Sequence, residues 1–367
     1  MGLIQTMFNP KTIALIGASE KNGTVGRSIL ENLQSSAKRK IYPVNPAREF
    51  ILGIKSYPDI TSVPEHVDLA VIATPARSVP QVTEECGQAG VDGVVIVSAG
   101  FKETGEEGRR LENEIKKIGK KYRMRILGPN SVGFVRPPIN LRATFLKNTP
   151  PPGHIAFISQ SAALGSAILD EAADARIGFS MFASLGDTID IDFADMIDFL
   201  EEYDEATKSI LLYMESVGDA RKFMSAARGF ARRKPIIVLK PGRFSESTKA
   251  ATQSHSGSMA GDDEVYGAAF RRAGVLRVKN IAELFDAAAV LVSRKFSKGP
   301  RVAIIGSAGP CIITTDAIIK RGGELADLSE ESMGQLNAVM PPYWNKANPV
   351  YLHGGATVEF SLGPAGP

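Results

Sequence analysis

Three features are scarce in this sequence, and each shortage excludes a class of protein. The two cysteines, Cys86 and Cys311, lie far apart in apolar segments, so they fit neither a disulfide framework nor a metal cluster. We expect buried, reduced thiols in a cytoplasmic protein. The 43 basic residues nearly balance the 40 acidic ones, and no basic block indicates a nucleic-acid partner. No apolar run reaches the roughly 18 residues of a membrane span, and the N-terminus lacks a signal-peptide pattern.

The chain is long enough to form several hydrophobic cores. Its 367 residues, of which 44% are apolar, predict about two or three domains. Short β-branched runs alternate with helical stretches, which is the pattern of a doubly wound parallel sheet. The strands expected in the first part are TIALIGAS, KIYPVNP, VDLAVIATP, VDGVVIVSAG and MRILGPN, with helices at 25–34, 79–89 and 106–121.

Proline-rich segments divide the chain. The motifs RPPIN and NTPPPGH interrupt the alternation, which restarts with HIAFISQS, IGFSMFASLGD, SILLYMES and PIIVLKPG. A second break at SKGPR precedes VAIIGSAGP. We therefore predict one domain up to about Asn130, a second from about Gly153 to Ser297, and the beginning of a third.

The first predicted strand ends in a glycine-rich loop, IGASEKNGTVG, which contains Gly17, Gly23 and Gly26. Such glycines let a phosphate approach backbone N–H groups and the positive end of a helix. The spacing differs from the dinucleotide fingerprint, and Arg48 follows the second strand where that fingerprint requires a carboxylate. An arginine suits a phosphorylated ribose, so the loop predicts coenzyme A or NADP, with a ligand-free tight turn as the alternative.

Three further turns, ATPA, SAGF and GPNSVG, follow strands at the same expected edge. Each alone fits an ordinary βα turn, but together they line the edge at which open parallel sheets bind ligands. The candidate nucleotide-binding residues are Gly17, Ser19, Asn22, Gly23, Thr24, Arg48, Thr74, Pro75, Ser98, Gly100 and Asn130.

Two small-polar turns precede helices in the second part of the chain. ISQSAALG places two serines at a helix start, one of them as N-cap, and TQSHSGSMAG surrounds His255 with serines and glycines. Two helix starts that converge would stabilise a phosphoryl group on or beside His255. A surface histidine in a loop is the alternative. The candidate phosphate-binding residues are Ser159, Ser161, Gly165, Ser256 and Gly257.

These motifs resemble, in order and spacing, the α part of the nucleoside-diphosphate-forming acyl-CoA synthetases, a superfamily that includes ADP-forming acetyl-CoA synthetases and the α subunit of succinyl-CoA synthetase. The similarity runs from about Asn9 to Pro349. His255 stands at the position of the family's phosphorylated histidine, and Glu215 at that of the glutamate that orients it. A simple pairing of Glu215 with a lysine is the alternative. GASEKNGTVG and PVNPAR resemble the segments that bind the pyrophosphate and the 3′-phosphate of coenzyme A, the latter through Arg48.

The resemblance implies an α/β fold with parallel sheets. Its expected parts are a Rossmann-like CoA-binding domain (1–130), a proline-rich connection (131–152), a flavodoxin-like ligase domain with the phosphohistidine (153–297), an incomplete second flavodoxin-like domain (301–350) and an atypical tail (351–367). It also implies the α component of an ADP-forming synthetase, with acetyl-CoA as the expected substrate. Acyl-CoA and phosphate would give acyl phosphate and CoA, and His255 would pass the phosphoryl group to a nucleoside diphosphate.

The nucleotide, as Mg-ADP or Mg-ATP, would bind to a partner β subunit with an ATP-grasp domain, in a hetero-oligomer. The chain alone would then perform only the coenzyme A half-reaction. No metal site is expected. Tyr351 replaces the family's aspartate after NPV, so we expect a truncated or frame-shifted C-terminus.

Two other functional classes remain as hypotheses. A non-catalytic CoA-binding regulatory module, as fused to acetyltransferases, would need neither His255 nor Glu215, and both are present. An NADP-dependent oxidoreductase would need a glycine spacing that the loop lacks.

Overall fold

The computed structural model describes residues 2–36, 39–174, 176–242, 263–292 and 299–352. The chain forms two compact units, Met1–Arg294 and Lys295–Pro367. His255, Ser256 and Gly257 lie outside the described residues.

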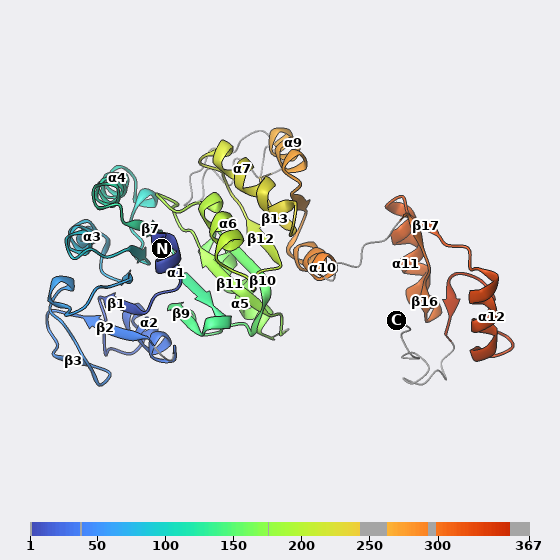
Figure 1. Ribbon diagram of the computed structural model, residues 1–367, viewed down its shortest axis with the longest axis horizontal. Helices are drawn as coiled ribbons and strands as arrows, with labels where there is room; N and C mark the ends of the chain where they lie inside the picture. The colour runs from blue at the N-terminus through green and yellow to red at the C-terminus, as the bar shows by residue number, and fades with distance from the viewer. Residues whose placement is uncertain (1, 37–38, 175, 243–262, 293–298, 353–367) are drawn as a thin grey trace. The chain divides into compact units, whose positions relative to one another are not determined.

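The larger unit begins with a five-stranded parallel sheet of order β2-β1-β5-β6-β7 (Figure 1). Alternate residues of a strand point to opposite faces, so Ile13 and Leu15 pack with helices α1 and α2, whereas Ala14 and Ile16 pack with α3 and α4. Because helices cover both faces of the sheet, its strands are apolar throughout. The elements are α1 (Leu3–Phe8), β1 (Thr12–Ile16), α2 (Val25–Gln34), β2 (Lys40–Val44), β3 (Phe50–Ile51), β4 (Ile54–Lys55), β5 (Leu69–Ile72), α3 (Val79–Gln88), β6 (Gly93–Ile96), α4 (Glu106–Tyr122) and β7 (Arg125–Leu127), with short 3₁₀ turns at Ile60–Ser62, Ala76–Ser78 and Lys102–Thr104.

A second sheet of seven strands follows, in the order β14-β13-β12-β10-β11-β8-β9. Its first five strands are parallel, and an antiparallel hairpin, β8–β9, joins the edge of β11. The elements are β8 (Gly133–Arg136), β9 (Leu141–Thr144), β10 (Pro152–Ser159), α5 (Ala162–Asp174), β11 (Phe179–Ser184), α6 (Phe193–Glu202), β12 (Ser209–Tyr213), α7 (Ala220–Ala231), β13 (Ile236–Leu239), α9 (Asp263–Ala273), β14 (Leu276–Val278) and α10 (Ile281–Val292), with a 3₁₀ turn at Pro137–Ile139.

The hairpin changes the role of the proline-rich segment 131–152, which the sequence predicts to be a connection. Strands β8 and β9 fall inside this segment, and they extend the second sheet rather than linking two domains as a bare loop. The prolines of the RPPIN motif lie in the 3₁₀ turn between the two strands, where no ladder hydrogen bond is required of them.

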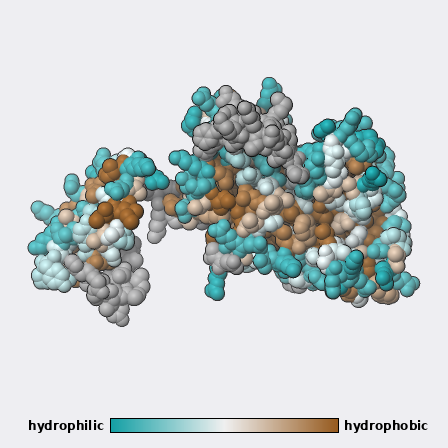
Figure 2. Space-filling view, turned by 180° about the vertical axis from the view of Figure 1, so that it is seen from behind, coloured by the Kyte–Doolittle hydropathy of each residue, from teal (hydrophilic) through white to brown (hydrophobic). Residues whose placement is uncertain are grey.

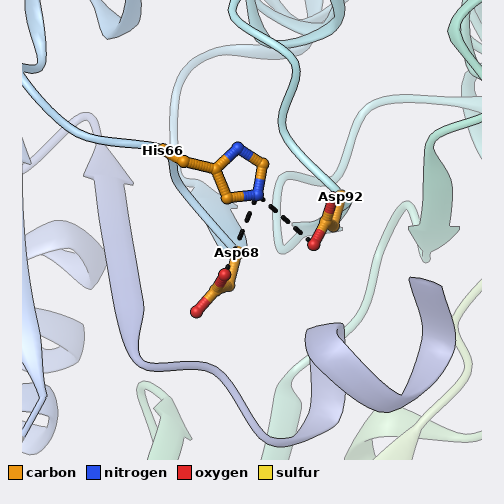
Figure 3. A group of neighbouring side chains, drawn as sticks. All are labelled: His66, Asp68 and Asp92. Carbon is orange, nitrogen blue, oxygen red and sulfur yellow. Dashed lines mark ion pairs between the residues drawn. The ribbon is translucent and has the colours of Figure 1, made fainter. Parts of the chain in front are cut away.

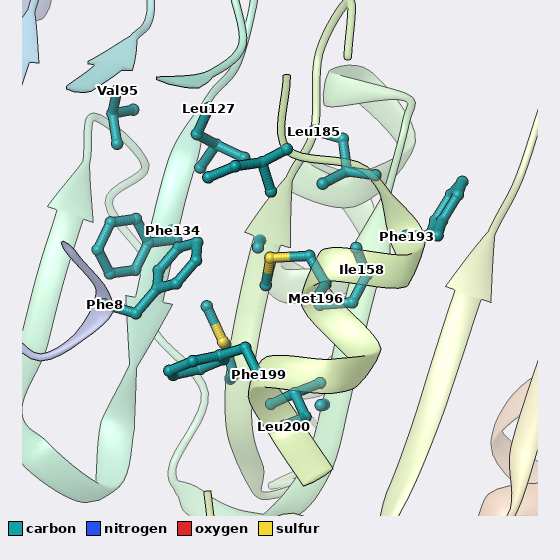
Figure 4. Close-up of a cluster of buried hydrophobic side chains, with 14 of the residues drawn as sticks. Phe8, Val95, Leu127, Phe134, Ile158, Leu185, Phe193, Met196, Phe199 and Leu200 are labelled. Atoms are coloured by element: carbon teal, nitrogen blue, oxygen red, sulfur yellow. The ribbon is translucent and has the colours of Figure 1, made fainter. Parts of the chain in front are cut away.

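The two sheets share a hydrophobic core. Phe8 of α1 packs edge-on against Phe134 of β8, with ring centroids 4.9 Å apart, and it lies 5.0 Å from the ring of Phe199 of α6 (Figure 4). All three rings are buried. The N-terminal helix therefore packs against both sheets and joins them into one compact unit.

The described part of the small unit, residues 299–352, contains two short parallel strand pairs and two helices. Its elements are β15 (Arg301–Val302), β16 (Ile305–Gly306), α11 (Ala308–Lys320), β17 (Glu324–Leu325), α12 (Glu330–Val339) and β18 (Val350–Tyr351). Met340, Trp344 and Val350 form its small buried core. Hydrophobic surface is visible on this unit in Figure 2, and Ile313 is 72% exposed. Among the described residues, no helix has the length and apolar character that a membrane span requires.

The predicted fold class is confirmed: α/β, with parallel sheets. Helix 25–34 matches α2, and the two other helix predictions in the first domain match α3 and α4 within one residue at each end. The domain boundaries stay a prediction. Helix α1, the hairpins β3–β4 and β8–β9, and strand β14 were not predicted from the sequence.

Candidate functional site

The strand order of the first sheet reverses between the ends of β1 and β5. The chain leaves β1 toward β2 on one side and returns to β5 on the other, which is the switch point where such sheets bind ligands. Gly17, directly after β1, has φ +90°, and a Cβ there would lie 2.7 Å from the carbonyl oxygen of Ala73. A Cβ on Gly26 would lie 2.0 Å from the oxygen of Gly17. Only glycine allows this close approach of helix α2 and both strand ends.

Helix α2 begins at this switch point without a side-chain cap. Thr24 is its N-cap residue, but the Thr24 hydroxyl donates to the carbonyl of Lys21 and makes no cap bond. The first N–H groups of such a helix are available to an anion. Ser19 accepts from the N–H of Lys21, while Asn22 and Gly23 are exposed in the same loop.

The turn after β2 is tied to the glycine loop by Asn45. Its amide nitrogen donates to the carbonyl of Ala18 (2.8 Å), and its amide oxygen accepts from the N–H of Ala47. Arg48 follows on this turn and is exposed. Asn45 was not predicted as a site residue, although an asparagine at a strand end is a common turn signal.

Hydrogen bonds link the ends of β5, β6 and β7 along the same edge. The hydroxyl of Ser98 donates to the carbonyl of Thr74 (2.5 Å), and the carbonyl of Ser98 accepts from the N–H of Asn130 (2.9 Å). The hydroxyl of Thr74 is buried and has no partner among the described residues. Pro75 follows it and is exposed. Gly100 differs, because its N–H already donates to the carboxylate of Glu103 (2.6 Å).

In the second sheet, the end of β10 leads into helix α5 through Ser159 and Ser161. The Ser161 hydroxyl accepts from the N–H of Leu164, as an N-cap residue does, and the buried Ser159 hydroxyl donates to the carbonyl of Ser161. Gly165 lies inside the helix, where its N–H donates to Ser161. A Cβ on Gly165 would lie 2.9 Å from the ring of Phe182, so packing accounts for this glycine. Its predicted contact with phosphate stays a prediction.

Glu215 lies just beyond β12 and is half-buried. Its N–H donates to the side-chain oxygen of Gln160 (2.6 Å), which also accepts from the N–H of Ser216 (3.0 Å). The Gln160 amide nitrogen donates back to the carbonyl of Ser216. Burial, together with the charge of Glu215, raises the pKa of Tyr213 to about 12. The carboxylate therefore stands on a loop held by three hydrogen bonds.

Lys240 lies at the end of the next strand, β13, and is 3% exposed. Its Nζ donates to the carbonyl of Pro241 (3.0 Å) and lies 4.7 Å from the ring centroid of Tyr266. Burial, and then the cation of Arg277, lower the pKa of Lys240, while Asp263 and Glu215 oppose this shift. Lys240 was not predicted from the sequence, although a lysine directly after the apolar strand IIVL is a usable signal.

The loop after β11 joins the second sheet to the first. A Cβ on Gly186 would lie 2.0 Å from the carbonyl oxygen of Pro129, and the N–H of Asp187 donates to that oxygen (2.9 Å). The Nζ of Lys102 lies 3.0 Å from the Asp187 carboxylate. The GPN turn of the first sheet and the SLGD turn of the second are therefore in direct contact.

Glu112 of α4 lies at this junction. The N–H of Lys102 donates to its carboxylate (3.0 Å). Burial raises the pKa of Glu112 to about 7, and the negative charge of Asp187 adds to this rise. A carboxyl group at the contact between the two sheets thus titrates near neutrality.

One group of possible metal ligands lies at the opposite, amino edge of the first sheet. The Nε2 of His66 is 3.4 Å from a carboxylate oxygen of Asp92 and 3.8 Å from one of Asp68 (Figure 3). The other oxygen of Asp68 accepts from the backbone N–H groups of Lys11 and Thr12. Since His66 is exposed and can pair with both carboxylates as a cation, the group is explained by ion pairing.

Family comparisons agree with this architecture. Residues 11–137 match the CoA binding domain, and residues 152–291 match the succinyl-CoA ligase-like flavodoxin domain. The α subunit of acetate–CoA ligase [ADP-forming] II from Pyrococcus furiosus is 43% identical over 97% of this chain and 78% of its own length. The chain belongs to the ADP-forming acyl-CoA synthetase family.

Acetate–CoA ligase [ADP-forming] I of Archaeoglobus fulgidus is 42% identical over 97% of this chain, but the chain spans only about half (51%) of that relative. The solved dinucleotide-forming acetyl-coenzyme A synthetase 1 of Ca. Korarchaeum cryptofilum, in complex with phosphate and ADP, is 37% identical, with a TM-score of 0.90. The alignment covers 96% of this chain and 76% of that one. The family is a ligase family, and its members known by name as α subunits imply a partner subunit.

Proposed function

We propose that this chain is the α component of an ADP-forming acyl-CoA synthetase that acts on acetyl-CoA. The observation that supports the proposal most is that polar side chains follow three neighbouring strands of the second sheet. Neighbouring strands β10, β12 and β13 present Ser161, Glu215 and Lys240 at one edge. In the sequence, Lys240 directly precedes the segment 241–262, which contains His255.

Coenzyme A would bind along the carboxyl edge of the first sheet. The start of α2, which the glycines Gly17 and Gly26 bring close to the strand ends, would bind the pyrophosphate, and Arg48 would pair with the 3′-phosphate. The buried hydroxyl of Thr74, which has no partner among the described residues, is a donor that such a ligand would satisfy. The other predicted contacts, from Ser19 to Asn130, lie along this edge.

In the first step, a phosphate oxygen attacks the thioester carbonyl carbon. The C–S bond breaks, CoA leaves as a thiol after taking up a proton, and an acyl phosphate forms. In the second step a ring nitrogen of His255 attacks phosphorus, the P–O bond breaks and the carboxylate leaves. The attacking nitrogen must be unprotonated, and Glu215 would accept a hydrogen bond from the other ring nitrogen to hold that tautomer.

Negative charge on the phosphohistidine would be stabilised by the start of α5, where Ser161 caps the helix, and by Ser256 and Gly257. The phosphoryl group would then pass to a nucleoside diphosphate, with Mg²⁺, on a β subunit that contains an ATP-grasp domain. Without that subunit, the chain would stop at the phosphohistidine. The expected assembly is a hetero-oligomer.

The test is phosphorylation of the chain from labelled inorganic phosphate and acetyl-CoA. We expect acid-labile, base-stable label that is absent in His255→Ala and retained in His66→Ala, because His66 lies at the amino edge of the first sheet. A non-catalytic CoA-binding module would bind coenzyme A without becoming labelled. An NADP-dependent oxidoreductase would neither bind coenzyme A nor become labelled. Absence of the label, with or without coenzyme A binding, would overturn the proposal.

A further inference from the structure

We infer that a cavity between the end of helix α4 and the loop after β11 is a binding site for a nucleoside phosphate. The cavity has a volume of about 350 Å³, and small-molecule sites occupy roughly 300–1,000 Å³. It lies at the amino end of β7, whereas the proposed coenzyme A contacts follow the carboxyl ends of the strands. The site is therefore distinct from the coenzyme A edge, and also from the nucleotide site expected on a partner subunit.

Two segments that are far apart in the sequence form the cavity wall. The loop after β11 runs along β7, where the N–H of Ile189 donates to the carbonyl of Gly128 (3.4 Å) and the N–H of Ile191 to that of Ile126 (3.1 Å). Helix α4 approaches the same strand closely, because a Cβ on Gly119 would lie 2.6 Å from the Cδ1 of Ile126. A ligand in the cavity would thus contact the first sheet and a loop of the second.

Three cations of the cavity wall have no counter-ion among the described residues. Lys116, Lys120 and Arg123 are exposed, and their side chains make no hydrogen bond or ion pair in the part of the chain that the structure describes. Lys121 of the same helix differs, since it pairs with Glu84. The helix dipole favours a basic residue in the last turn, which accounts for Lys120 but does not reach back to Lys116.

Asp190, the acidic residue of the cavity wall, is already paired. Its carboxylate accepts from the Nε of Arg125 (2.9 Å) and from the N–H of Ile126 (2.8 Å). Arg125 also lies 3.0 Å from the carboxylate of Asp195. The charge left over at the cavity is therefore that of the three other cations. It favours a ligand with more than one negative charge, as a phosphate carries.

Apolar side chains complete the cavity wall. Met124, Ile126 and Ile189 line it, and each is at most 9% exposed. They offer apolar surface to a ligand beside the three cations, which is the usual make-up of a small-molecule site. A nucleoside phosphate has both matching parts, a flat base and a phosphate group, whereas inorganic phosphate has only the second.

The experiment measures ADP binding to the full chain by calorimetry, in the presence of saturating coenzyme A. The coenzyme A keeps ADP away from the carboxyl edge of the first sheet. We expect Lys120→Met and Arg123→Met each to weaken ADP binding about 10-fold, because each removes a hydrogen bond to a charged group. The double variant should bind ADP more weakly than either. Lys117→Met removes an exposed lysine of α4 that does not line the cavity, and this control should bind like the unmodified chain.

Inorganic phosphate, titrated in the same way, should bind more weakly than ADP because it lacks the base. An equal affinity for phosphate would overturn the assignment of a nucleoside ligand. Loss of ADP binding on addition of coenzyme A, or unchanged binding in the double variant, would overturn the site itself. These outcomes do not depend on labelling of His255, so the inference and the proposed function can fail separately.

Discussion

Gln160, just after β10, holds the backbone of Glu215, just after β12, through a hydrogen bond of 2.6 Å from the Glu215 N–H to the Gln160 side-chain oxygen. The two strands are direct neighbours, with Ser159 opposite Tyr213. The carboxylate that we propose to orient His255 is thus positioned by a residue 55 places earlier in the chain.

Replacing Gln160 by alanine should therefore impair the second half-reaction. The change leaves the N–H groups of Glu215 and Ser216 without their acceptor, which costs about 1–3 kcal/mol for buried donors and frees the loop. We expect labelling from acetyl phosphate to slow about 10- to 100-fold. Coenzyme A binding, measured by calorimetry, should not change. Gln81→Ala, at an exposed site on α3, is the control, and equal labelling in both variants would contradict the role of Gln160.

The close approach of Gly26 to Gly17 at the switch point of the first sheet leads to a second prediction. Gly26→Ala would place a methyl group 2.0 Å from the Gly17 oxygen, so helix α2 must move away from the strand ends. We expect weaker coenzyme A binding and a loss of about 1–3 kcal/mol in the free energy of unfolding. Calorimetry and urea titration measure the two effects. The control is Gly334, a helical glycine with open space around it. Its alanine variant should keep both its coenzyme A affinity and its free energy of unfolding.

The carboxyl of Glu112 leads to a prediction about pH. Its pKa is raised from 4.5 to about 7 in the folded chain, so the folded state holds a proton that the unfolded state has released. This group therefore makes the free energy of unfolding fall as the pH rises from about 4.5 to 7, and adds no slope above that. Glu112→Gln should remove this fall. Urea titrations across this pH range should show that the free energies of unfolding of the unmodified chain and of Glu112→Gln diverge. The control Glu114→Gln, on the exposed side of α4, should follow the unmodified chain.

The buried ion pair between Arg136 and Asp204 gives a fourth prediction. Their charged atoms are 3.0 Å apart, and Arg136 also donates to the carbonyl of Phe8 in the shared core. Asp204→Ala would leave the arginine buried without its partner, so we expect a loss of about 3–5 kcal/mol in the free energy of unfolding. Glu107→Ala, which breaks an exposed pair with Arg110, should change stability little. Similar small losses in both variants would show that the Arg136 pair does not hold the core together.

Local sequence patterns were sufficient to predict helices α2, α3 and α4 and the central strands. Helix α2 could be predicted to its ends because apolar residues at helical spacing follow directly on a small-polar loop. The hairpin β8–β9 could not, because strand β8 is defined by its pairing with β11, and the prolines between the two strands resemble a linker. Gly165 illustrates the same limit, since the sequence does not reveal its close packing against the Phe182 ring.

For the site, the sequence alone determined the glycine loop after the first strand, the serine-capped start of α5, and the carboxylate at position 215. Each depends on residues close together in the chain. Only the tertiary structure brings Gln160 and Lys240 to the same sheet edge as Glu215. They come together only when apolar strands that are distant in sequence pair in the order β14-β13-β12-β10. Burial of both sheet faces selects that order, and no local pattern of charge or spacing encodes it.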